Sequence, residues 1–250
     1  MPELRISHSV FIQTQNVRNV VTMMDDVGMD VGEGKFGVVY GKAGLGKSET
    51  VKWYHANRKN TVYLESTAIW ITSELEFLRD FCFELGIENI AHRKGRCFRD
   101  IIEYLFEHPD TIIFIDEAGR LKGGHLELMR DITRMTLCPI VLIGEHNLLN
   151  LLKYGGRDGI QTRTFNPVKF SPMKQSDVII FAKEAAGVKI GADVSAILHK
   201  TATKNTTDGN FRLVKRALQY AIQYANGKNT DRITPEIANM AIKSAIKWTE

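Results

Sequence analysis

Gly41-Lys42-Ala43-Gly44-Leu45-Gly46-Lys47-Ser48 decides the fold, because this stretch matches the pattern GxxxxGK[ST] at every specified position. An apolar run, 36–40, precedes it and a segment with helical character, 48–58, follows it, which is the strand–loop–helix context that the pattern requires. Glycines let backbone N–H groups turn inward around a phosphate, and the following helix presents its unpaired N–H groups to the same anion. The sequence therefore predicts a loop that binds nucleotide phosphates.

The side chains of this loop have expected roles. Lys47 is expected to reach the β- and γ-phosphates, and the Ser48 hydroxyl to ligate Mg²⁺. ATP and Mg²⁺ are therefore the expected cofactors. The residues expected to line the nucleotide are Gly41, Lys42, Ala43, Gly44, Leu45, Gly46, Lys47, Ser48 and Glu49.

An acidic pair, Asp116-Glu117, follows the apolar run 111–115 and begins 69 residues after Lys47. A buried strand would deliver Asp116 beside the phosphate loop, where its carboxylate holds Mg²⁺ through a water or through Ser48. Glu117 is expected to orient or deprotonate the attacking water. The pair predicts that ATP is hydrolysed as well as bound.

Two-thirds of the chain alternates short apolar runs with amphipathic stretches, which predicts an α/β fold: a three-layer αβα sandwich around a parallel five-stranded sheet. Three of the expected strands lack period-2 alternation, as is typical of parallel strands covered on both faces. The expected strands are 36–40, 61–65, 111–115, 140–143 and 167–170, and the helices between them are 48–58, 74–85, 98–107, 126–135 and 146–152.

After Ser171-Pro172 the pattern predicts helices only, near 176–186, 195–203, 211–226 and 235–247. Thr234 and Pro235 have the residue types of a helix N-cap and first helical position. We therefore predict a core over 1–172, which includes a short N-terminal segment 1–34, and a small helical lid over 173–250.

Composition narrows the class of protein. The chain has 250 residues, 44% of them apolar, which excludes a disordered tail or a coiled coil. Its longest apolar run is far shorter than the roughly 18 residues that a membrane span needs, so no membrane partner is expected. The three cysteines lack metal-binding spacing, and reduced, buried thiols are expected.

The phosphate loop, the acidic pair and the helical lid together resemble the AAA+ ATPases. The resemblance implies a polar residue after the fourth strand that senses the γ-phosphate, for which Asn147, His146 and Glu145 are candidates. It also implies a lid arginine on a Gly-x-x-Arg motif. Gly209-Asn210-Phe211-Arg212 matches that motif and assigns the role to Arg212.

The same resemblance implies an arginine finger, which reaches the ATP of a neighbouring subunit from a position just before the fifth strand. Arg157 and Arg163 both qualify. An arginine there stabilises charge on the transferring phosphoryl group. The resemblance further implies a polar switch, for which Glu65-Ser66 is the candidate, that restrains Glu117 until a ligand binds.

A finer resemblance is to the DNA transposition ATPases of Mu-like phages, the MuB type. It rests on the compact start at 11–18, on Glu49-Thr50-Val51 after the phosphate loop, and on a short basic lid, since 196–250 hold nine Lys/Arg and four Asp/Glu. It implies sequence-independent binding of double-stranded DNA in the ATP state, self-assembly into a ring or helical filament, and a transposase as partner. The implied location is the cytoplasm of a prokaryotic or phage-infected cell, at the nucleoid.

A basic segment, 92–99, is the expected DNA contact, as a loop between two helices. It carries four formal positive charges, and such charges give salt-sensitive contacts to phosphates. The candidate DNA-binding residues are Arg93, Lys94, Arg96, Arg99 and, after the acidic pair, Lys122.

Two other functions remain open from the sequence. One is a helicase loader or replication-initiation ATPase, which shares the same motifs. The other is a nucleotide-gated switch that acts on protein partners and binds no DNA. Neutralising the basic segment separates this last class from the DNA-binding ones.

Overall fold

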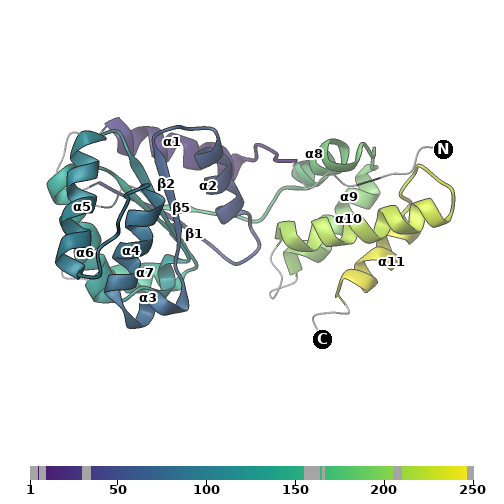
Figure 1. The fold of residues 1–250 in the computed structure, drawn as a ribbon. Helices are drawn as coiled ribbons and strands as arrows, with labels where there is room; N and C mark the ends of the chain where they lie inside the picture. Colours follow the sequence, from purple (N-terminus) through teal and green to yellow (C-terminus); the bar gives the residue numbers. More distant parts are fainter. Residues whose placement is uncertain are drawn as a thin grey trace. The chain divides into compact units, whose positions relative to one another are not determined.

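The computed structural model describes residue 5 and residues 10–29, 35–154, 164, 167–204 and 210–246. The chain forms two compact units (Figure 1). The α/β unit comprises Asn16–Gly41 and Lys47–Phe170, and the helical unit comprises Met1–Gln15, Lys42–Gly46 and Ser171–Glu250. The boundary at 172/173 expected from the sequence stays a prediction.

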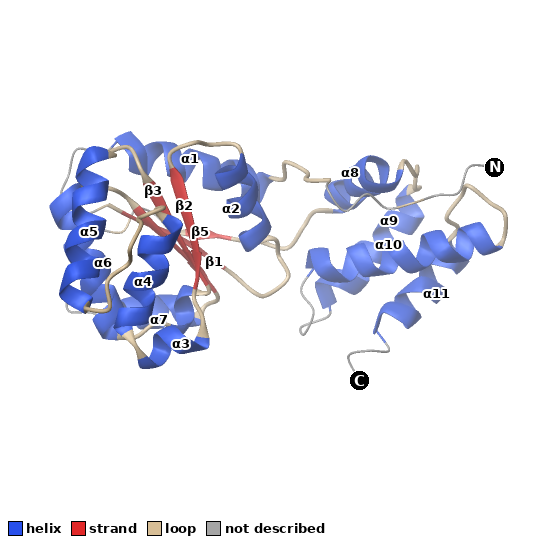
Figure 2. Ribbon diagram, viewed as in Figure 1, coloured by secondary structure: helices blue, strands red, loops and turns tan. Residues whose placement is uncertain are grey.

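Five parallel strands form the sheet of the α/β unit, in the order β2-β3-β4-β1-β5 (Figure 2). This confirms the predicted α/β class and its parallel five-stranded sheet. The strands are β1 (Phe36–Tyr40), β2 (Thr61–Glu65), β3 (Ile112–Asp116), β4 (Ile140–Gly144) and β5 (Val168–Lys169).

Alternate side chains of the strands build two different interfaces. Those on one face, such as Val38, Leu64 and Ile115, share a single apolar core with the helices that follow β2, β3 and β4. These helices are α3 (Ala68–Thr72), α4 (Glu74–Glu84), α5 (Lys94–Glu107), α6 (Gly123–Thr136) and α7 (Asn147–Tyr154). Parallel strands buried on both faces explain the near-continuous apolar runs in the sequence.

The opposite face of the sheet packs against α1 (Gln15–Met29) and α2 (Lys47–Ala56). The ring of Tyr54 in α2 meets the ring of Phe114 edge-on, with centroids 5.9 Å apart. Gly37 of β1 lies directly beneath α1, because a Cβ atom there would come within 2.7 Å of Met23 Sδ. Helices on both faces of the sheet give the three layers that the sequence predicts.

Helix α1 was not predicted from the sequence, although Val17, Val20, Met24 and Val27 recur at helical spacing and are all buried. Helix α5 begins at Lys94, four residues before the start of the predicted helix 98–107. The basic segment 92–99 is not a loop: all but its first two residues form the first turns of this helix. Ion pairs that two of its basic side chains make with carboxylates, described below, offset the unfavourable placement of cations at a helix N-terminus.

The helical unit contains α8 (Gln175–Ala186), α9 (Ala192–Lys204), α10 (Asn210–Gly227) and α11 (Pro235–Ile246) around its own apolar core. Helix α11 begins as the sequence predicts, since Thr234 Oγ1 accepts a hydrogen bond from the backbone N–H of Ile237 at 3.3 Å. Among the described helices, none combines the length and the apolar character needed to cross a bilayer.

We expect Gly37→Ala to lower the free energy of unfolding by about 1–3 kcal/mol, because the new methyl group overpacks the contact between β1 and α1. Urea unfolding measures this as a lower midpoint with an unchanged slope. Gly227→Ala is the matched control, since a Cβ atom there meets nothing within 4 Å. Equal stability of the two variants would contradict the close packing of α1 on the sheet.

Candidate nucleotide site and basic surface

The phosphate loop connects β1 to α2 through glycines in the left-handed region, Gly44 at φ 76° and Gly46 at φ 95°. A Cβ atom on Gly46 would meet nothing within 4 Å, so the backbone conformation, and not lack of space, requires glycine there. Lys47 is the first residue of α2 and only 8% exposed. Its Nζ donates to the carbonyl oxygen of Gly41 at 2.9 Å, which places the ammonium group against the start of the loop.

Asp116 is the last residue of β3 and is 3% exposed. Both of its carboxylate oxygens accept hydrogen bonds, Oδ1 from the backbone N–H of Glu117 and Oδ2 from the hydroxyl of Tyr63, each at 2.7 Å. Burial, together with the bond to Asp116, raises the pKa of Tyr63, so its hydroxyl keeps the proton that it donates. The structure thus holds this carboxylate in one orientation.

Glu117 lies in a different environment from its neighbour. Its backbone is left-handed, with φ 53° and ψ 30°, a conformation that is uncommon for glutamate and that is found at functional sites. Its side chain is 45% exposed, and Oε2 lies 3.6 Å from Nε of Arg120. A half-exposed carboxylate beside a buried one suits the separate roles of water activation and metal binding.

Asn147, the first residue of α7, contacts the turn that follows the acidic pair. Its Nδ2 donates to the carbonyl oxygen of Gly119 at 3.3 Å, and a Cβ atom on Gly119 would lie within 2.5 Å of Asn147 Oδ1. His146 instead places its ring edge against Tyr40, with centroids 5.4 Å apart. Glu145 is exposed. Of the three sensor candidates, Asn147 is therefore the one tied to this turn.

Glu65 and Ser66, which are expected to restrain Glu117, make contacts with residues other than the Glu117 side chain. Glu65 Oε2 lies 3.6 Å from Nζ of Lys52. Ser66 donates its backbone N–H to the carbonyl oxygen of Asp116 at 3.0 Å, and its buried hydroxyl has no hydrogen-bond partner in the described part of the chain. In this structure Glu117 is paired with Arg120, a residue that was not predicted to belong to the site.

Of the three arginines expected to contact ATP, the structure describes Arg212. Arg212 is exposed in α10, next to Phe211, whose backbone N–H donates to the carbonyl oxygen of Gly44 at 3.1 Å within the helical unit. Arg157 and Arg163 lie outside the described residues. The roles of all three stay predictions.

The donor set at the end of β3 and the start of α2 fits a magnesium nucleotide. Lys47 supplies a cation, and Ser48 and Asp116 supply the oxygen ligands that Mg²⁺ prefers. Mg²⁺ bound to a nucleotide needs only one or two protein ligands, with phosphates and waters completing its shell. The described residues contain no group of three or more His, Cys, Asp or Glu side chains that could hold a metal ion on its own.

A second feature is the basic surface, which we define as Arg93, Lys94, Arg96, Arg99 and Lys122, all of them exposed. Two of its charges are already paired: Lys94 with Glu74, and Arg96 Nε with Asp100 Oδ1 at 2.8 Å. For the side chains of Arg93 and Arg99, the described part of the chain offers no ion pair.

Glu74 connects the two parts of the basic surface, which are the residues from 93 to 99 and Lys122. Its carboxylate bonds to Lys94 at the start of α5, and it also lies against Gly124 at the start of α6, where an added Cβ atom would collide with it. Lys122 is two residues before Gly124 and six residues after Asp116. The basic surface therefore adjoins the segment that leaves the acidic pair.

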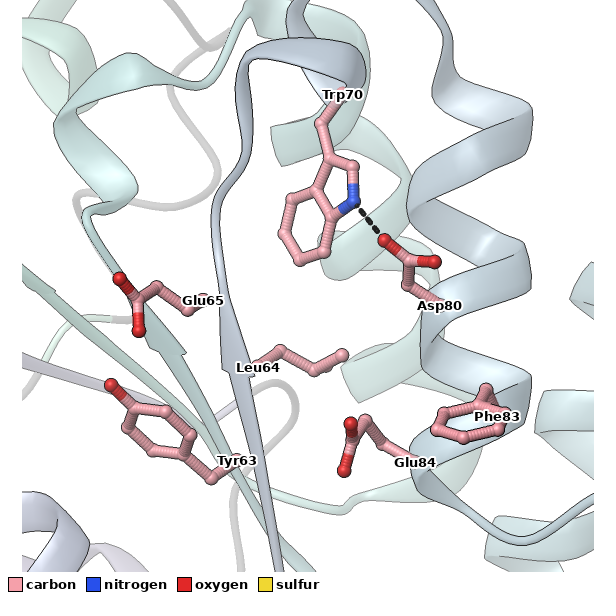
Figure 3. Close-up of a pocket in the computed structure, with 7 residues that line it drawn as sticks. All are labelled: Tyr63, Leu64, Glu65, Trp70, Asp80, Phe83 and Glu84. Carbon is pink, nitrogen blue, oxygen red and sulfur yellow. Dashed lines mark hydrogen bonds between the residues drawn. The ribbon is translucent and has the colours of Figure 1, made fainter.

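A pocket of about 270 Å³ lies along β2, the edge strand (Figure 3). Figure 3 shows Tyr63 and Glu65 on one side of the strand and Leu64 on the other, where Trp70 Nε1 donates to Asp80 Oδ2 at 2.6 Å. The pocket is lined by Tyr63, Leu64, Glu65, Trp70, Asp80, Phe83 and Glu84. Three carboxylates make it unsuited to phosphate, so it is not the nucleotide site.

Sequence reasoning missed Tyr63, the partner of Asp116. The sequence pattern that could have indicated Tyr63 is the alternation of side chains along the expected strand, which puts Tyr63 on the same face as Glu65. The pairing of β2 with β3 that brings this face to Asp116 is not visible in the sequence.

Comparison with known proteins supports ATPase activity of the chain. A family model described as an AAA domain matches residues 30–152. The ATP-dependent target DNA activator B proteins of Escherichia phages D108 and Mu are both 27% identical over 237 residues, which cover 93% of this chain and 72% of each relative.

Solved structures with the same fold include the ORC2 protein of Aeropyrum pernix, with a TM-score of 0.70 and 11% identity over 97% of this chain and 70% of that chain. Domain III of the Thermotoga maritima replication initiation protein DnaA matches with a TM-score of 0.56 and 15% identity, over 95% of both chains. At these identities the likeness concerns the fold alone.

We expect Gly46→Ala to lower affinity for ATP at least about tenfold, because alanine resists the left-handed conformation and turns the loop's N–H groups away from the phosphate. Titration with a fluorescent ATP analogue measures the loss. Gly187→Ala is matched to it, since Gly187 has φ 64° and equally open space around its Cα. Both variants should lose about 1–2 kcal/mol of stability. A similar loss of nucleotide affinity in both would contradict a specific role for Gly46.

Proposed function

Because the chain is an ATPase with an AAA domain over residues 30–152, we propose that it binds double-stranded DNA in its ATP-bound state and presents that DNA to a transposase. The observation that carries the proposal is the similarity to two target DNA activators, which spans 93% of the chain and therefore includes residues of both units. The basic surface supplies a physical means of holding DNA without reading its sequence.

The nucleotide part of the function rests on the phosphate loop and on residues of the α/β unit. Lys47 and the N–H groups of the phosphate loop bind the phosphates, and Ser48 and Asp116 would hold Mg²⁺. When bound, the ion neutralises charge that develops on the phosphates. Glu117 orients the attacking water and accepts its proton. Asn147 fixes the turn that follows Glu117 and would report on the γ-phosphate.

DNA binding is assigned to the basic surface for two reasons. The first turn of α5 contains no acidic residue, so the positive end of its helix dipole adds to the charges of the side chains. Arg93 and Arg99 also have charges that no described carboxylate neutralises. Contacts of this kind favour any DNA sequence and weaken steeply with salt.

Self-assembly is assigned to Arg157 and Arg163. We propose that one of them completes the nucleotide site of a neighbouring copy, in a ring or a helical filament, so that copies join when ATP is bound. Arg212 would contact the same γ-phosphate from its own copy. Hydrolysis would then release the assembly from DNA, which couples Glu117 to the lifetime of the DNA complex.

A Glu117→Gln variant should bind ATP normally but hydrolyse it at least about a hundredfold more slowly, because the amide cannot accept the proton of water. Its complex with DNA should therefore persist, as measured by phosphate release and by the decay of fluorescence anisotropy of labelled duplex DNA after dilution. Lys47→Ala serves as the contrasting variant, which should lose both ATP and DNA binding. Normal turnover by Glu117→Gln would refute the assignment of the base.

A double variant, Arg93→Gln with Arg99→Gln, should weaken binding to any duplex about tenfold or more and reduce the slope of log affinity against log salt by about two. The charge-matched control is Lys59→Gln with Lys183→Gln, two exposed lysines outside the basic surface. Lys94→Gln with Arg96→Gln should have a smaller effect, because their charges are already paired. If the first pair binds DNA like the wild type while ATP binding is intact, a nucleotide-gated switch for protein partners is the better function.

A further inference from the structure

Tyr63 is the one side chain among the described residues that donates a hydrogen bond to the carboxylate of Asp116. The remaining bond to that carboxylate comes from the backbone N–H of Glu117. A carboxylate has about four acceptor positions, so these two bonds fix its orientation and leave positions for a metal ion or a metal-bound water. The geometry is that of a metal ligand held by an outer partner.

The pairing of β2 with β3 explains why a tyrosine reaches this atom. Tyr63 lies opposite Phe114, and Glu65 lies opposite Asp116, so Asp116 is the diagonal neighbour of Tyr63 on one face of the sheet. A diagonal neighbour is within reach of an aromatic side chain. Figure 3 shows Tyr63 and Glu65 on the same side of β2, as this face requires.

Two side chains of helix α2 lie near the ring of Tyr63. Nζ of Lys52 lies 5.2 Å from the centre of the ring, and the ring of His55 lies 6.2 Å from it. His55 Nδ1 is in turn hydrogen-bonded to Thr61 Oγ1 at 2.7 Å, which fixes His55 to the first residue of β2. The same helix begins with Lys47 and contains Ser48, so Tyr63 bridges the element that carries Ser48 and the strand that carries Asp116.

We propose that Tyr63 is a positioning residue for Mg²⁺: its hydroxyl orients Asp116, and its ring keeps Asp116 in register with Ser48 on α2. The inference rests on the proposed function, in which Ser48 and Asp116 hold the metal. It assigns to Tyr63 a role in metal affinity and none in binding of the nucleotide itself.

The test is Tyr63→Phe, which removes the hydroxyl and keeps the ring against Lys52 and His55. Affinity for a fluorescent ATP analogue is measured over a range of Mg²⁺ concentrations and also in EDTA. The Mg²⁺ concentration for half-maximal enhancement of binding should rise about ten- to a hundredfold, the usual effect of removing an outer partner of a metal ligand. Affinity in EDTA should stay that of the wild type.

Tyr224→Phe is the matched control, because it removes a tyrosine hydroxyl bonded to Ser244 at 2.7 Å in the helical unit. It should leave the Mg²⁺ requirement unchanged. In an Asp116→Ala background, Tyr63→Phe should produce no additional shift, since the hydroxyl acts only through Asp116.

Three results would overturn the inference. They are an unchanged Mg²⁺ requirement in Tyr63→Phe, an equal loss of affinity with Mg²⁺ and in EDTA, and an additive shift in the Asp116→Ala background. Failure of the wild type to bind ATP is a separate result, which would refute the proposed function and the inference together. Failure of DNA binding alone would refute the proposed function and leave the role of Tyr63 intact.

Discussion

The chain has to reverse direction between β1 and α2 within the few residues from Gly41 to Gly46 while keeping its N–H groups turned inward. Gly44 and Gly46 meet this constraint with left-handed backbone that other residues adopt only at a cost. The turn places Lys47 at the start of α2 and lets β1 lie between β4 and β5 in the sheet. The acidic pair, the turn after it and Asn147 then gather at the carboxyl ends of neighbouring strands, where polar groups lie outside the apolar core.

Much of this arrangement could be predicted from the sequence, and the reason is burial. Strands such as Ile140–Gly144 are covered on both faces, so their residues are apolar in a row and bounded by polar ones. The phosphate loop could be predicted because only glycine suits its backbone. Helix α5 was placed too late because its first turn is basic and exposed, and the carboxylates that pair with it come partly from α4. Charge alone does not reveal such pairings.

The contact between Tyr63 and Asp116 was beyond prediction for a different reason. It depends on which strands are neighbours and on their register, and neither follows from the pattern of one strand. The same holds for Asn147, which could not be separated from His146 and Glu145 until the turn at Gly119 was located in space. Residues that act through contacts between elements distant in sequence are the ones that sequence reasoning leaves undecided.

Charge on the α/β unit is distributed unevenly along α4. The helix begins with Glu74, which anchors the basic surface, and its later residues Asp80 and Glu84 line the acidic pocket at β2. A polyanion is attracted to the first region and repelled by the second. In the proposed DNA complex, this arrangement would restrict the orientations in which a duplex can approach, without any contact to bases.

Gly119 and Asn147 occupy adjoining space, since a methyl group on the first would overlap the amide of the second. A larger residue at position 119 is compatible with the fold only if position 147 shrinks or withdraws. Across descendants of a common ancestor the two positions should therefore change together. A lineage that has replaced glycine at 119 should also have replaced asparagine at 147.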